Sequence, residues 1–179
     1  MGTKSEALAK QFEAKAQEAL TTLEQLSEAD WKKMTAAEKW PVGVTAHHLA
    51  GAFEAVSGLI TMLASGQSRG MFTPAQLDER NAQHARDHAN CTKVETIALH
   101  RKGAATAAAT VRGLSDEQLA KSGVVLTGVP PMTTEQLVTR VEQHQRLTRD
   151  PRYPPGQPQR IRARIGAEGR LADCRIAQR

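Results

Sequence analysis

Two of the six histidines in this chain stand four residues apart, in the segment His84-Ala-Arg-Asp-His88. On an α-helix this spacing puts both imidazoles on one face, as two ligands of one metal ion require. The residues between them lack the glutamate of the zinc-protease motif, and the flanking residues are polar. The pattern leaves two interpretations, a metal site and a solvated helix face, and the polar surroundings favour the solvated face.

Three more histidines lie on segments with helical apolar spacing. At about 100° per residue, His48 falls on the edge of the apolar stripe of its helix, and His47 falls on the far side, towards solvent. His144 shares a face with the apolar residues of the last helix. A bundle builds metal sites from side chains on facing helices, so His48 and His144 are candidate ligands. The alternative is that each is a partly buried structural histidine.

The other chemically interesting residues suggest less. His100 precedes Arg101 and Lys102, which favours a surface position. Cys91 stands alone on a helix, and we interpret it as a small, partly buried residue rather than a nucleophile. With Cys174 it makes no disulfide framework, which fits a reducing cytoplasm. We find no phosphate-binding glycine loop, nucleophile elbow, secretory signal or membrane-length apolar run.

The elements that must position these residues are helices. The chain is rich in alanine and has only 3% aromatic residues, which favours helices over sheets. Apolar residues at spacings of three and four predict long helices. They cover residues 5–26, 45–64, 74–111 and a last helix that begins after Thr133, with a possible break near Gly103 or Ala89-Asn90. Residues 124–129 form the one run typical of a strand. Four amphipathic helices with short connections predict an all-α fold, a four-helix bundle.

The net charge of +5 is unevenly distributed over the 179 residues. Residues 1–145 hold 15 Lys+Arg and 16 Asp+Glu, whereas residues 146–179 hold nine Arg, no Lys and three acidic residues. Proline also becomes frequent in the second part, and helical periodicity disappears. We therefore expect a helical bundle over residues 1–148 and an irregular, basic, Pro/Arg-rich tail over 149–179. Such a tail could bind nucleic-acid phosphates weakly, although a charged tail without that role is the favoured interpretation.

One segment resembles a known family. A tryptophan at Trp40, a short turn at Pro41-Val42-Gly43 and a helix carrying His48-Leu49-Ala50 resemble the DinB-like superfamily. That superfamily includes YfiT-like metal-dependent hydrolases, bacillithiol transferases and the amino-terminal domain of mycothiol-dependent maleylpyruvate isomerase. The resemblance extends over roughly residues 5–145, where the order of helices and turns is similar.

The resemblance implies a four-helix bundle, often dimeric, that holds a divalent metal, zinc or nickel, with three histidines. By the matching motif the first ligand is His48 and the second is His144. The third is expected at position 148, where this chain has Thr148. A site with two histidines and a hydroxyl would bind metal weakly or lose it, unless another histidine or a carboxylate substitutes.

The missing histidine coincides with the loss of lysine and of apolar periodicity, which suggests a shift of reading frame between residues 140 and 146. Three functions remain open. The first is a metal-dependent transferase or hydrolase acting on a small molecule or a low-molecular-weight thiol, expected as a cytoplasmic homodimer. The second is a catalytically silent helical binding or scaffold protein. The third is a weak nucleic-acid binder that uses the basic tail.

Overall fold

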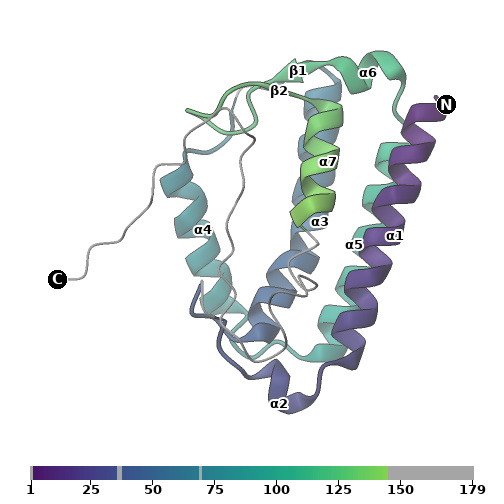
Figure 1. The fold of residues 1–179 in the computed structure, drawn as a ribbon. Coiled ribbons are helices and arrows are strands. Elements are labelled where there is room, and N and C mark those ends of the chain that lie inside the picture. Colours follow the sequence, from purple (N-terminus) through teal and green to yellow (C-terminus); the bar gives the residue numbers. More distant parts are fainter. Residues whose placement is uncertain (1, 36–37, 69, 145–179) are drawn as a thin grey trace.

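The computed structural model describes residues 2–35, 38–68 and 70–144, and within them the chain is an all-α bundle (Figure 1). Its helices are α1 (Thr3–Gln25), α2 (Glu28–Trp31), α3 (Val42–Ala64), α4 (Pro74–Asp87), α5 (Lys93–Arg112), α6 (Asp116–Ala120) and α7 (Thr134–His144). Two short antiparallel strands, β1 (Ser122–Gly123) and β2 (Met132–Thr133), pair between α6 and α7. The predicted fold class is confirmed. The expected tail, residues 149–179, lies outside the described residues.

Helices α1, α3, α5 and α7 form the four-helix bundle, and the short helices and α4 surround it (Figure 1). One cluster of buried residues joins the beginning of α1 to the ends of α3 and α5. Another joins the end of α1 to the beginnings of α3 and α5. Helices α3 and α5 therefore run in the same direction, because α4 carries the chain back along the bundle between them. No helix in the described ranges has the length and apolarity needed to cross a membrane.

Most helices begin at a capping box, in which one side chain accepts from a backbone N–H three residues on and a second side chain accepts in return. The capping residues are Ser27, Thr73, Thr92, Ser115 and Thr133. Thr92 explains why the long helix expected over 74–111 is two helices. The break at Ala89-Asn90 is confirmed, whereas Gly103 continues α5.

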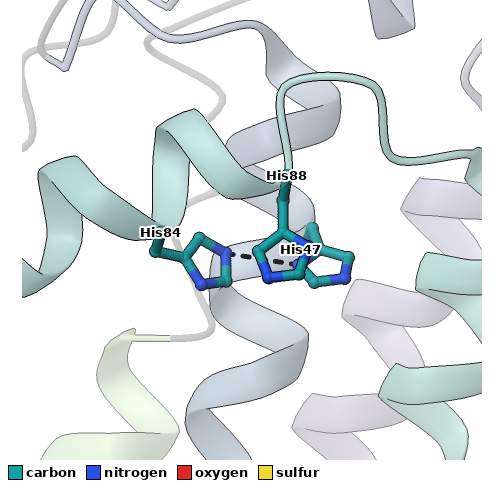
Figure 2. Close-up of side chains that lie close together, drawn as sticks. All are labelled: His47, His84 and His88. Carbon is teal, nitrogen blue, oxygen red and sulfur yellow. Dashed lines mark hydrogen bonds between the residues drawn. The ribbon is translucent and has the colours of Figure 1, made fainter.

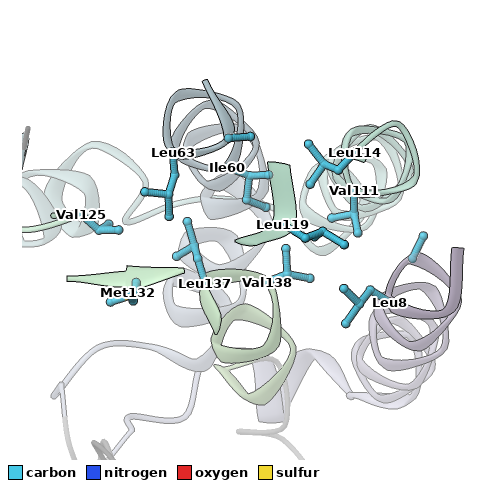
Figure 3. Close-up of a cluster of buried hydrophobic side chains, with 12 residues drawn as sticks. Leu8, Ile60, Leu63, Val111, Leu114, Leu119, Val125, Met132, Leu137 and Val138 are labelled. Atoms are coloured by element: carbon cyan, nitrogen blue, oxygen red, sulfur yellow. The ribbon is translucent and has the colours of Figure 1, made fainter. Parts of the chain in front are cut away.

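The largest buried cluster closes one end of the bundle (Figure 3). It contains Ile60 and Leu63 from α3, Val111 from α5, and Leu137 and Val138 from α7. Each fully buried aliphatic side chain contributes about 1.5–3 kcal/mol relative to an exposed one, so this cluster is a main source of stability.

Residues 124–129 do not form the predicted strand. They make a loop between β1 and β2 that turns at Gly128, whose φ of 83° suits glycine. Their apolar side chains serve the core instead, because Val125 is buried and Leu126 and Val129 pack against the cluster of Figure 3. An apolar run alone does not distinguish a strand from an inward-facing loop.

His100 is buried, not exposed as its basic neighbours suggested, and only 3% of its surface is accessible. Its ring lies edge-on to Phe53 with the centroids 5.0 Å apart, and its Nδ1 has no hydrogen-bond partner among the described residues. Successive residues on a helix point about 100° apart, so Arg101 and Lys102 do not determine where His100 points. Burial lowers the pKa of His100 to about 4.

The buried His100 predicts a stability that falls with acidification. The pKa of His100 is about 4 in the folded chain, against 6.5 for an unperturbed histidine. The unfolded chain therefore binds the proton first, and stability is full above pH 6.5 and declines as the pH falls from there towards 4. Between pH 7.5 and 5 this group removes about 2 kcal/mol from the free energy of unfolding.

Urea unfolding of the wild type and of His100→Leu at both pH values measures this contribution. The variant should lose about 2 kcal/mol less than the wild type on acidification. Equal losses in the two proteins would show that His100 does not cause the effect.

Trp31 of α2 fixes the beginning of α3, the helix that carries His47 and His48. The indole is buried, and its Nε1–H donates to the carbonyl of Cys91 at 3.1 Å. A Cβ at Gly43 would overlap the indole ring. The glycine therefore lets α2, α3 and the turn before α5 meet at one place.

Two glycine substitutions on α3 should have opposite effects. Gly43→Ala should destabilise the protein by about 1–3 kcal/mol because the added methyl group displaces Trp31. Gly58→Ala is the matched control, since nothing lies within 4 Å of its Cβ position. It should stabilise by up to about 1 kcal/mol, the gain in helix propensity. Thermal unfolding of both variants measures the difference, and a neutral Gly43→Ala would contradict the close packing.

Candidate metal centre

Three histidines meet where the beginning of α3 lies against the end of α4 (Figure 2). His47 comes from α3, His84 from α4, and His88 from the residue that follows α4. Each offers one ring nitrogen, and these nitrogens all lie within 4.8 Å of one another. We refer to His47, His84 and His88 as the histidine triad.

Local sequence positions two members of the triad, and tertiary packing adds the third. The i,i+4 spacing places His84 and His88 on one side, as predicted. His47 does lie on the side of α3 away from the apolar stripe, but α4 covers that side. All three side chains are half-buried. The face of α4 expected to be solvated is thus partly covered by α3.

The spacing within the triad suits a metal ion. His47 Nδ1 and His84 Nε2 are 3.2 Å apart, so one imidazole donates its N–H to the other. Two nitrogens bound to a tetrahedral zinc ion at about 2.0–2.1 Å stand about 3.3 Å apart. The ring of His88 stacks on that of His47, with centroids 4.0 Å apart. Because an imidazole lone pair lies in the plane of its ring, the stacked His88 would have to turn and approach for all three nitrogens to share one ion.

Two members of the triad, His47 and His84, favour the neutral form that metal binding needs. Burial, and then the neighbouring His48, His88 and His47, lower the pKa of His84 to about 4. Burial and His88 also lower the pKa of His47. Neutral imidazoles keep a lone pair for a metal, so no protonation competes with binding at these two residues near pH 7.

His48, predicted as a ligand, lies beside the triad without belonging to it. Its ring is edge-on to His84, with centroids 5.1 Å apart, and edge-on to Trp40 at 5.7 Å. His144 is the last residue of α7, and neither its side chain nor Thr148 is within the described residues. The pairing of His48 with His144 therefore stays a prediction.

Cys91 follows the triad by three residues and is half-buried. Its side chain packs against the cluster of Leu23, Trp31 and Ala46. Burial raises the pKa of the thiol, which disfavours the thiolate that a nucleophile or metal ligand must be. This agrees with its interpretation as a small, partly buried residue.

Three imidazoles can hold a divalent cation and leave a fourth coordination position free. That is the arrangement of a catalytic rather than a closed structural zinc site. The sequence analysis did not predict the histidine triad because it assigned His47 to solvent. The signal that could have pointed to the triad is the i,i+4 pair of His84 and His88.

Comparison with known proteins agrees with this fold. Over 79% of the chain, the structure is similar to that of the mycothiol-dependent maleylpyruvate isomerase, with a TM-score of 0.62 and 15% identity. It is also similar to a histidine-to-alanine variant of that enzyme, with a TM-score of 0.59 and 16% identity over 79% of the chain. The matches cover 56% and 58% of those chains, so this protein corresponds to little more than half of their length.

No functionally curated protein matches the sequence. The family model of the mycothiol maleylpyruvate isomerase N-terminal domain matches residues 12–145, most of the chain and nearly all of the described bundle. The expected resemblance is thus confirmed, and the chain belongs to the family of mycothiol maleylpyruvate isomerase N-terminal domains.

Proposed function

We propose that this protein is a divalent-metal-dependent enzyme that acts on a small molecule with the help of a low-molecular-weight thiol. The observation that carries the proposal is the histidine triad, whose three ring nitrogens lie within 4.8 Å of one another. Family membership supports the dependence on a thiol, because the similar solved structure is that of a mycothiol-dependent isomerase. Transferase or hydrolase chemistry would use the same kind of site.

We propose zinc or nickel as the metal, since imidazole nitrogens suit both. His47, His84 and His88 are the ligands that the geometry favours. The resemblance offers a second set, His48 with His144. The two sets are neighbours, because the rings of His48 and His84 lie 5.1 Å apart. A functional homodimer in the cytoplasm remains a prediction from the resemblance.

A metal bound here would lower the pKa of a thiol or water at its open position and so supply a nucleophile near neutral pH. The chain contributes in two ways. The imidazoles of His47 and His84 favour the neutral form because they are half-buried and close to other histidines, so they present lone pairs to the cation. The triad is also only half-buried, which leaves a path for a small thiol to reach it.

Zinc titration followed by calorimetry distinguishes the two ligand sets. The wild-type protein should bind one zinc ion, and His47→Ala and His84→Ala should each weaken binding by at least about tenfold, the loss of one of three ligands. His48→Ala is the matched control, because it removes the neighbouring imidazole on the same helix and leaves the triad intact.

The opposite pattern, with zinc affinity lost in His48→Ala and kept in His84→Ala, would favour the set taken from the resemblance. A wild-type protein that binds neither zinc nor nickel would contradict metal dependence altogether.

The thiol can be tested on a cobalt-substituted protein, in which coordination is visible in the absorption spectrum. Mycothiol, or cysteine as a simpler thiol, should add a sulfur-to-cobalt charge-transfer band because a thiolate enters the open position. The band should be absent from His84→Ala. A spectrum that neither thiol changes, on protein shown to hold cobalt, would speak against thiol-dependent chemistry.

A further inference from the structure

Helix α4 lies against the bundle without entering its core. None of its residues from Pro74 to Asp87, all in the described part of the chain, is buried. By contrast, α3 buries nine residues, from Gly43 to Ala64. Its apolar residues Leu77, Ala82 and Ala85 are only partly buried, so apolar burial holds α4 less firmly than it holds the helices of the bundle.

The segment before α4 is anchored by its backbone. The N–H groups of Gly70 and Met71 donate to the carbonyls of Val124 and Val125 at 2.7 and 3.3 Å. The N–H of Thr127 donates back to the carbonyl of Phe72 at 2.9 Å. These bonds fix where α4 begins, but they lie at the opposite end of the helix from the triad.

The last turn of α4 contacts α3 through imidazoles. His84 accepts or donates the hydrogen bond to His47 at 3.2 Å, and its ring is edge-on to His48. His84 also lies over Gly51, with its Cε1 3.9 Å from where a Cβ would stand. One neutral hydrogen bond adds only about 1 kcal/mol to stability, so these contacts alone hold the end of α4 weakly.

A cation shared by the triad would change this balance, because its ligands belong to both sides of the contact. His47 is on α3, whereas His84 and His88 are on α4 and the turn after it. Binding free energy at a site that exists only when two elements are docked also stabilises the docking. The metal would thus connect α4 to α3 in place of a hydrophobic core.

We propose that a divalent metal ion bound by the histidine triad fastens the end of α4 to α3, so that metal occupancy controls whether this helix stays docked. The proposal rests on the metal site of the proposed function and adds a conformational role to it. Release of α4 would uncover the side of the His48 ring that now lies against His84. Metal loss would then alter the surface around the site as well as remove the ion.

Hydrogen exchange followed by mass spectrometry, on the full chain with zinc and after metal depletion, tests this role. Zinc should slow exchange at least about tenfold in peptides from residues 80–92, because local opening there becomes less frequent. Peptides from residues 8–23 of α1 should change little. The zinc effect should vanish in His47→Ala, which leaves the sequence of α4 unchanged, and persist in His48→Ala.

Native mass spectrometry of the same samples reports zinc stoichiometry and so separates two kinds of failure. One bound zinc with unchanged exchange in residues 80–92 would overturn the fastening role while the proposed function stands. No bound zinc would overturn both. An exchange effect lost equally in His47→Ala and His48→Ala would also overturn the proposal. Should His47→Ala fail to fold by circular dichroism, His88→Gln replaces it, with the same expected loss.

Discussion

The hydrogen bond between His47 and His84 joins α3 to α4, a helix with no fully buried residue, and the candidate site depends on it. Helix α3 is firmly placed, because its apolar stripe packs along α5 and Trp31 fits against Gly43 at its beginning. Helix α4 has no such support. The triad therefore joins a helix of the bundle core to a helix outside it, so a metal bound by all three histidines would link metal binding to helix docking.

The helices could be predicted from the sequence because their signals are local. Apolar spacing gave α1 and α3 within a few residues, and Thr133 with Gln136 predicted the beginning of α7. The break before α5 was predicted as one of two alternatives, Ala89-Asn90 or Gly103, and the capping box of Thr92 and Glu95 accounts for the one that occurs. In each case the deciding interactions lie within one turn of the residue concerned.

The site could be predicted only in part because its members meet through tertiary packing. The i,i+4 pair showed that His84 and His88 share a face, but not that α3 would lie against that face. His47 was assigned to solvent because a helical wheel divides a helix into one apolar face and one solvent face. In this structure α4 covers the face that was assigned to solvent. The predicted surface position of His100 was wrong for a related reason. Its two basic neighbours in the sequence suggested exposure, whereas its ring packs against Phe53.

The family and the triad offer different ligands for one kind of metal. The resemblance implies ligands on α3 and on the last helix, His48 and His144. The described geometry favours ligands on α3 and at the end of α4, where His47 meets His84 and His88. This sequence has Thr148 at the position where the resemblance expects a third histidine, so ligands from elsewhere in the chain would be needed to complete a site of three histidines. The ring of His84 lies beside those of both His47 and His48, so the two candidate ligand sets are direct neighbours.

X-ray absorption at the zinc edge, on the zinc-loaded wild type and on His84→Ala, counts these ligands directly. The wild type should show three imidazoles at about 2.0–2.1 Å and one water oxygen, and the variant should show one imidazole fewer. A wild-type spectrum with two imidazoles that His84→Ala leaves unchanged would contradict the histidine triad as the metal centre.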